Sequence, residues 1–259
     1  MMNENSNVSQ PIDRLFSIIE YLAQKRLPVR LIDISSALSI PQPTVLRYLR
    51  SLSLKGYVYH DSNSGMYALT WKMCKLSDNL NTDMVLKSIV SPFLTELAYT
   101  FELGACVVIK HGLGTIYLDV VGDPKNKTNT TMRIGKNAPI HTTGSGKVIL
   151  SSLQDHEIDN IINNIGLPRL TNNTITNKRD LFNEINKIRE CGYGIDNEEC
   201  EDGHKCISVP IYDYTGGVAA AISLFGSIYE MTDTFMLNEL LPVLKEKARL
   251  ISFRLGYDQ

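Results

Sequence analysis

The pattern of residues 31–69 restricts the fold of this chain more than any other feature, because it places helix, turn and helix within a short distance. Apolar residues recur every three or four positions over 31–38 and again over 45–52, which predicts two helices that each bury one face. Residues 39–42 interrupt the repeat. Pro43 suits the first turn of the second helix, since a proline there gives up only an amide that has no helical partner.

Two short runs with strand composition follow the second helix. Gly56 can end that helix in a left-handed conformation, and Tyr57–His60 and Met66–Leu69 then flank the turn-rich segment 61–65. Helix, turn, helix and hairpin in this order predict a winged helix-turn-helix domain, a shape that fits the major groove of DNA. A protein-binding module of the same shape is the alternative, because a fold alone does not fix a function.

The unburied face of the second helix carries the side chains that we expect to contact DNA. They are basic or hydrogen-bonding groups of the kinds used on base edges and phosphates in the major groove, and Arg47 is the principal candidate. The predicted DNA-binding residues are Gln42, Thr44, Arg47, Tyr48 and Arg50 on this helix and Arg30 at the start of the preceding one.

Length and charge indicate a two-domain chain. Its 259 residues suffice for two cores, and residues 1–75 hold nine Lys and Arg against five Asp and Glu, a net +4, whereas the remainder is net −6. So small a positive charge predicts that several subunits bind one duplex together, because phosphate neutralisation supplies much of the affinity. No apolar run reaches the roughly 18 residues of a membrane span, and no hydrophobic signal core is present. We therefore expect a cytoplasmic protein that binds no membrane and keeps its five cysteines reduced.

Helical segments surround the winged motif on both sides. A helix over 11–23 should brace it, and helices over 71–80 and 83–101 should connect it to the rest of the chain, the second one kinked or restarted at Ser91-Pro92. We expect three parts: a winged helix-turn-helix DNA-binding domain over 8–72, linker helices over 73–101 and an effector-binding domain over 102–259.

From about Leu103 the periodicity changes to that of strands. The predicted strands cover 103–110, 115–121, 193–196, 206–212 and 218–225, and the predicted helices cover 144–153, 155–164, 178–191 and 233–255. An antiparallel sheet flanked by helices is the simplest packing of this order, so the fold class is α+β.

A glycine-rich turn, Gly144-Ser145-Gly146, begins one of these helices. Exposed amides at a helix start can hold an anion, so the turn could bind the carboxylate of a small metabolite. The alternative is that the glycines only allow the helix to pack closely on the sheet. A nucleotide P-loop matches poorly, because His141 stands where its first glycine is needed and Val148 replaces the Ser or Thr that would bind magnesium.

Asp196, His204 and Cys206 bring a carboxylate, an imidazole and a thiol into one stretch of sequence. Two apart on one strand, His204 and Cys206 share a face and could line a pocket. Nothing in the spacing predicts a nucleophile in contact with its base, so no catalytic residue is assigned. With Asp196 or His141 the pair could ligate zinc, but no CxxC or HxxxH spacing supports this, and no metal or cofactor is predicted. The acidic run Glu198, Glu199, Glu201 and Asp202 is expected to form a solvated face.

The stretch from Gly192 to Asp213 resembles a known family. Its pattern, Gly192-x3-Asp196-x2-Glu199-x6-Cys206-Ile207-Ser208-x2-Ile211-Tyr212-Asp213, is similar to the effector-domain signature of IclR-type transcriptional regulators. Residues 41–49 resemble the recognition helix of that family and 134–147 its pocket-forming turn, so the resemblance covers nearly the whole chain. It implies a winged helix-turn-helix joined by a linker helix to a GAF-like domain that binds a small metabolite. It also implies a homodimer or dimer of dimers that regulates, and more often represses, a catabolic operon.

The resemblance carries over to individual positions. It implies effector contacts at Gly144, Ser145, Asp196, Cys206 and Ser223, with His204 at a pocket-lining position that is often apolar in the family. The chain departs from the family at Gln42 and in the wing, where basic residues are usual, and Ser39 replaces the usual turn glycine. The sequence thus predicts a DNA-binding regulator, not an enzyme, controlled by an organic acid or sugar acid. A small-molecule-binding or protein-interaction module without DNA binding is the alternative.

Overall fold

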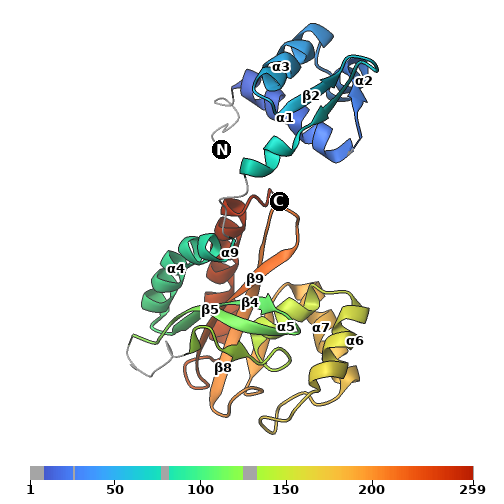
Figure 1. Ribbon diagram of the computed structural model, residues 1–259. Helices are drawn as coiled ribbons and strands as arrows, with labels where there is room; N and C mark the ends of the chain where they lie inside the picture. Colours follow the sequence, from blue (N-terminus) through green and yellow to red (C-terminus); the bar gives the residue numbers. More distant parts are fainter. Residues whose placement is uncertain (1–8, 26, 77–81, 125–132, 259) are drawn as a thin grey trace. The chain divides into compact units, whose positions relative to one another are not determined.

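The computed structural model describes residues 9–25, 27–76, 82–124 and 133–258. The chain divides into two compact units, Met1–Asn81 and Thr82–Gln259, each of which is described by itself (Figure 1). In the described part of the chain, no helix combines the length and the apolar character needed to cross a membrane.

The first unit has the helices and the hairpin that its sequence predicts. The hairpin strands pair antiparallel from Val58↔Leu69 to Asp61↔Met66. A two-residue strand that was not predicted completes a three-stranded sheet by pairing Val29 with Tyr67. The elements are α1 (Gln10–Lys25), β1 (Val29–Arg30), α2 (Leu31–Leu38), α3 (Gln42–Leu54), β2 (Val58–Asp61), β3 (Met66–Leu69) and the 3-10 helix η2 (Trp71–Leu76).

Backbone geometry fixes both ends of the helix-turn-helix. Ser39 follows α2 with φ 54°, the left-handed conformation that a glycine would adopt at less cost. The Ser35 hydroxyl donates to the Ile40 carbonyl at 2.7 Å and closes the turn. Gly56 follows α3 with φ 76°, and its amide and that of Tyr57 donate back into the last turn of the helix, which is a Schellman motif.

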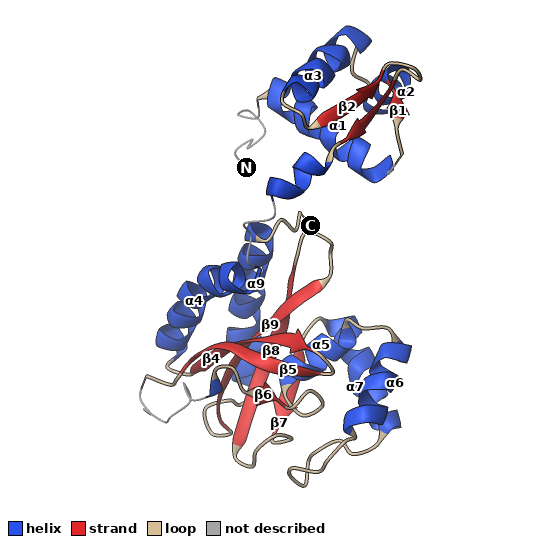
Figure 2. Ribbon diagram, viewed as in Figure 1, coloured by secondary structure: helices blue, strands red, loops and turns tan. Residues whose placement is uncertain are grey.

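The second unit is built on one six-stranded antiparallel sheet, as the α+β prediction requires (Figure 2). Its strand order is β6-β5-β4-β9-β8-β7, so the two central strands come from distant parts of the sequence. The two-residue strand β6 was not predicted. The strands are β4 (Gly104–His111), β5 (Gly114–Val121), β6 (Asn137–Ala138), β7 (Gly194–Asn197), β8 (His204–Tyr212) and β9 (Val218–Ser227).

Helices cover both faces of this sheet. On one face, α4 (Thr82–Phe101) and α9 (Leu241–Arg254) share a core with alternate residues of β8 such as Ile207 and Val209. Between β9 and α9 lie the short α8 (Asp233–Phe235) and a π-helical turn, Met236–Leu240. On the other face lies α5 (Gly144–Ser151), with α6 (Asp155–Ile165) and α7 (Lys178–Cys191) beyond it (Figure 2).

Helix α4 belongs to the core of the second unit, although its residues fall in the segment that the sequence assigns to linker helices. Leu86, Val90 and Leu94 are at most 5% exposed and pack in the core that includes β4. The helix runs through Pro92 as one element, without the predicted restart. Of the helix predicted over 71–80, η2 covers the first part, and residues 77–81 lie outside the described ranges.

Candidate functional site

The start of α5 is held tightly against the sheet. Thr143 caps the helix, and its hydroxyl accepts from the Gly146 amide at 3.1 Å. A Cβ built on Gly144 would lie only 2.8 Å from Ser208 Oγ and 3.0 Å from Cys206 Sγ. Glycine is therefore required here for close approach. Because the Gly144 and Gly146 amides already donate, to Cys206 Sγ and Thr143 Oγ1, two of the amides considered for an anion are occupied within the protein.

Hydroxyl and thiol groups form a connected row on the face of the sheet beneath α5. Ser208 and Ser223 are paired across β8 and β9, and their hydroxyl oxygens lie 2.6 Å apart. Cys206 Sγ lies 3.9 Å from Ser208 Oγ at one end, and Cys106 contacts Ser223 at the other. The row gives this face of the sheet a polar strip, whereas the residues of β8 and β9 that point to the opposite face, such as Ile207 and Ile222, belong to the apolar core.

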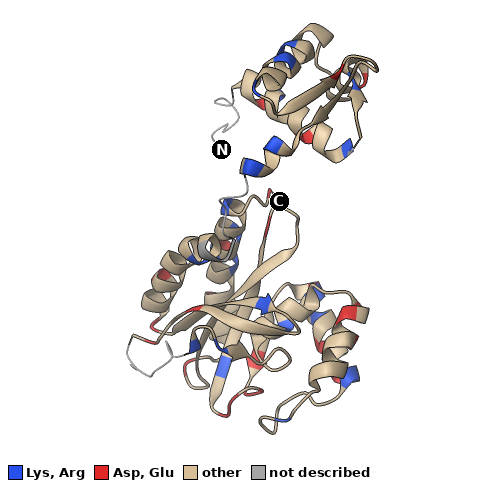
Figure 3. Ribbon diagram, viewed as in Figure 1, with Lys and Arg blue, Asp and Glu red and all other residues tan. Residues whose placement is uncertain are grey.

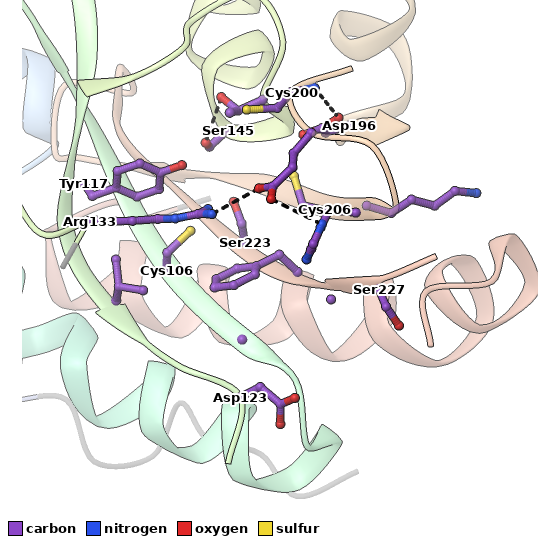
Figure 4. Close-up of a pocket in the computed structure, with 18 of the residues that line it drawn as sticks. Cys106, Tyr117, Asp123, Arg133, Ser145, Asp196, Cys200, Cys206, Ser223 and Ser227 are labelled. Carbon is purple, nitrogen blue, oxygen red and sulfur yellow. Dashed lines mark hydrogen bonds and ion pairs between the residues drawn. The ribbon is translucent and has the colours of Figure 1, made fainter. Parts of the chain in front are cut away.

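A cavity of about 420 Å³ lies over this strip (Figure 4). Five of the six residues predicted to bind the effector line it: Ser145, Asp196, His204, Cys206 and Ser223. Gly144 is not among the lining residues, because it packs behind them against β8. The cavity is also lined by residues that the sequence did not single out, among them Tyr117, Thr143, Cys200, Lys205 and Phe225. Its volume lies in the lower part of the range of about 300–1,000 Å³ that small-molecule sites occupy.

Arg133 brings a positive charge to the wall of the cavity. Its Nη2 lies 3.3 Å from Oε2 of Glu201, and it also contacts the buried hydroxyl group of Tyr117. Burial works against the charge of the guanidinium, but Tyr117 and Glu201 outweigh it and raise the pKa of Arg133. Glu201 is exposed, as the expected solvated acidic face requires, and its carboxylate also pairs with this cation of the cavity wall.

The prediction of a solvated acidic face is wrong at Glu199. This side chain is buried, and its Oε1 lies 2.5 Å from Nζ of Lys147, which is fully buried and also contacts Glu184 at 3.1 Å. Burial raises the pKa of Glu199 to about 6 despite the lysine. An acidic run can be solvated at some positions and buried at others when a cation from another helix meets it, and the run itself does not show which.

Asp196 is the buried carboxylate of the cavity. Its Oδ1 accepts from the amides of Glu199 at 2.8 Å and Cys200 at 3.3 Å, which fixes the loop after β7. Burial raises the pKa of this carboxyl to about 6, although both amide hydrogen bonds lower it. A carboxyl that gains a proton near pH 6 can accept or donate a hydrogen bond to a bound molecule.

The cysteines of the cavity are not poised for catalysis. Burial raises the pKa of Cys106 to about 12 and that of Cys206 still further, so both thiols stay protonated at neutral pH. Among the residues that the structure describes, no group of three or more His, Cys, Asp or Glu is placed to hold a metal ion. The cavity is thus suited to binding a molecule by hydrogen bonds and charge.

The six residues predicted to contact DNA lie on α3 and at the end of β1. Gln42, Arg47 and Arg50 are exposed, whereas Thr44 and Tyr48 are half-buried. The Arg47 guanidinium lies 5.4 Å from the centre of the Tyr48 ring, a cation–π contact that orients it. Arg30, also exposed, precedes α2. Basic residues occur on α3 and η2 (Figure 3), whereas residues 58–69 of the wing contain neither Lys nor Arg.

Comparisons with known proteins agree with this architecture. Residues 11–62 match the model of the IclR helix-turn-helix domain, and residues 80–253 match that of the bacterial transcriptional regulator IclR C-terminal domain. The chain is 30% identical over 254 residues to the HTH-type transcriptional regulator KdgR of Escherichia coli (strain K12), covering 94% of this chain and 92% of KdgR. It is 29% identical over 250 residues to the HTH-type transcriptional repressor AllR of Salmonella typhimurium (strain LT2), covering 96% of this chain and 90% of AllR.

Solved structures show the same relationship. The crystal structure of the Thermotoga maritima IclR protein superposes with a TM-score of 0.63 and 29% identity, covering 95% of this chain and 98% of that one. The inducer-binding domain of the transcription factor PobR from Acinetobacter, a double mutant in complex with 3-hydroxybenzoic acid, gives 0.60 and 26%, covering 64% of this chain and 96% of that domain. The family consists of transcriptional regulators rather than enzymes. The chain belongs to the IclR family of bacterial transcriptional regulators, with a helix-turn-helix DNA-binding domain and a C-terminal effector domain.

Proposed function

We propose that this regulator represses a catabolic operon and releases it when a small anionic metabolite, an organic acid or a sugar acid, binds in the C-terminal cavity. The cavity carries the proposal, because it combines hydrogen-bonding groups such as Ser145 and Ser223 with the cation of Arg133. Two relatives support the two parts of the proposal, which are repression and an acidic effector. AllR is a repressor, and the inducer-binding domain of PobR was crystallised with an organic acid.

The proposal assigns one role to each of three consecutive segments of the chain. The winged domain over 8–72 binds operator DNA, residues 73–101 link it to the sensor through α4, which packs in the core of the second unit, and residues 102–259 bind the effector in the cytoplasm. The DNA contacts are Arg30, Gln42, Thr44, Arg47, Tyr48 and Arg50, and the effector contacts are Ser145, Asp196, His204, Cys206 and Ser223. Gly144, the sixth residue predicted for the effector site, contributes by letting α5 approach the sheet.

Self-association is part of the proposal. The wing carries no Lys or Arg and Gln42 is uncharged, so one winged domain neutralises few phosphates. A homodimer or a dimer of dimers doubles or quadruples these contacts on one duplex. Effector binding then acts as a switch if it favours one arrangement of the paired domains over another, because a ligand shifts an equilibrium only by its different affinity for the two states.

Fluorescence anisotropy with labelled duplexes from the region upstream of the chain's own gene tests the DNA half. We expect sequence-selective binding that weakens as salt is raised, and a loss of about tenfold or more in affinity for Arg47→Ala, since one good base contact is worth about 1–3 kcal/mol. Arg179→Ala, which removes the same charge from the exposed surface of α7, is the matched control and should bind normally. If the affinity for DNA depends neither on the salt concentration nor on the sequence of the duplex, the result would instead support an interaction module without specific DNA binding.

A further inference from the structure

Arg133 and Glu201 form an ion pair that spans the wall of the effector cavity. They come from segments 68 residues apart, one preceding β6 and the other in the loop between β7 and β8, and both line the cavity. The second carboxylate oxygen of Glu201 lies 3.8 Å from Nδ1 of His204, a third lining residue. Figure 4 shows the labelled Arg133 side chain at the cavity, with a dashed line marking its ion pair.

Both side chains of this ion pair are partly exposed, and Arg133 is also held by a buried neighbour. Arg133 is 43% exposed and contacts Tyr117, whose side chain is 8% exposed and lies in the core on the α5 face of the sheet. Glu201 is 53% exposed and lies in the loop between β7 and β8. An ion pair with this much exposure contributes little to stability, so its carboxylate can be exchanged without much loss.

We propose that the Glu201 carboxylate occupies the place of the effector's own carboxylate, and that the effector binds by displacing it from Arg133. This inference rests on the proposed function, because it assumes an anionic effector. Arginine pairs with a planar carboxylate through two parallel hydrogen bonds, so a free acid can offer Arg133 a better partner than a side chain that contributes one oxygen at 3.3 Å. Arg133 is thus the residue that selects carboxylates, and Glu201 is an internal competitor that sets the affinity.

The exchange has a structural consequence near the cavity. Glu201 follows Glu199 and Cys200, whose amides donate to Asp196, and Gly203 donates to the Glu198 carboxylate at 2.9 Å. Release of Glu201 therefore changes the contacts of a loop whose backbone is attached to Asp196, a cavity residue. The effector is sensed by a loop of the protein and not only by the groups that touch it.

Isothermal titration calorimetry on the full chain tests the exchange. The probes are lactate, gluconate, benzoate and 3-hydroxybenzoate, each compared with its neutral primary amide. Glu201→Gln removes the competing charge and keeps the shape, so it should tighten binding of the carboxylates about two- to fivefold, the range set by a half-exposed ion pair, and leave the amides unchanged. Arg133→Gln should weaken carboxylate binding by about tenfold or more. In an Arg133→Gln background, Glu201→Gln should have no further effect.

Asp202→Asn is the matched control, because it removes an equal charge from the same loop at an exposed position outside the cavity lining. If the carboxylates bind wild type and Glu201→Gln with equal affinity, the proposed displacement of Glu201 is wrong. It is also wrong if Asp202→Asn raises their affinity as much as Glu201→Gln does. Either result would leave the proposed function standing. If neither wild type nor Glu201→Gln binds any of the acids, the anionic effector itself is wrong, and the exchange is wrong with it.

Discussion

Nζ of Lys147 lies 2.5 Å from Oε1 of Glu199 in the interior of the second unit, and the lysine side chain has no exposed surface. The same ammonium group contacts Glu184 at 3.1 Å. The buried lysine of α5 therefore joins that helix both to α7 and to the loop between β7 and β8 that carries Glu201. Removing the charge should loosen three segments around the cavity.

We predict that Lys147→Met lowers the free energy of unfolding by about 3–5 kcal/mol at pH 8, because it leaves a buried carboxylate without its partner. At pH 5 the loss should be smaller, since burial already raises the pKa of Glu199 to about 6 and the carboxyl gains a proton there. Lys178→Met is the control. It breaks a pair with Asp159 whose side chains are 53% and 37% exposed, and should cost less than about 1 kcal/mol in the same urea titrations. Equal losses for the two variants would contradict the prediction.

The raised pKa of Asp196 predicts that the stability of the protein depends on pH. The pKa of this carboxyl is raised from 3.8 to about 6, mainly by burial, so the folded protein binds the proton more tightly than the unfolded chain does. The buried charge therefore opposes folding above pH 6, and this cost disappears as the pH falls toward 4.

Asp196→Asn removes the charge but keeps an oxygen that can accept from the Glu199 and Cys200 amides. We expect the variant to be more stable than wild type at pH 7.5, by up to about 3 kcal/mol, and the gap to close by pH 4. Urea unfolding across this pH range measures the difference. A variant that is less stable at pH 7.5, or a difference that does not change with pH, would show that the buried charge does not oppose folding.

Gly144→Ala tests the close approach of α5 to the sheet. The new methyl group would lie 2.8 Å from Ser208 Oγ and 3.0 Å from Cys206 Sγ, so we expect a loss of about 1–3 kcal/mol in stability together with weaker acid binding. At Gly114 the nearest atom to such a methyl group is the His111 carbonyl oxygen at 4.0 Å, so Gly114→Ala should change stability by less than about 0.5 kcal/mol. Thermal unfolding and calorimetry measure both effects, and similar values for the two glycines would refute the packing argument.

Local patterns were sufficient to predict most elements of both units. The helical repeat of α3 and the turn signals around Gly56 and Gly65 are properties of neighbouring residues, so they can be read without a structure. The strands β1 and β6 could not be predicted, because two residues carry no periodicity. Val29 and Ala138 acquire strand geometry only by pairing with Tyr67 and Thr115, which are distant in sequence.

The residues of the cavity also include some that could not be predicted from the sequence, because their positions depend on distant partners. Ser145, Asp196, Cys206 and Ser223 were assigned through resemblance to a family. Arg133 gave no such signal, since its place in the cavity depends on contacts with Tyr117 and Glu201 that only the folded sheet creates. Glu199 was misassigned for a related reason. Its sequence neighbours are acidic and polar, and the cation that allows its burial lies 52 residues away in α5.

Coupling between the cavity and the DNA-binding domain is the central claim, and the DNA dissociation constant measured with and without a saturating acid tests it most directly. The acid is one shown by calorimetry to bind wild type and to be weakened by Ser223→Ala. We predict that it changes the DNA dissociation constant by about fivefold or more, and that saturating operator DNA changes the affinity for the acid by the same factor, because coupling between two binding sites is reciprocal. An unchanged DNA dissociation constant with the cavity fully occupied would contradict the account.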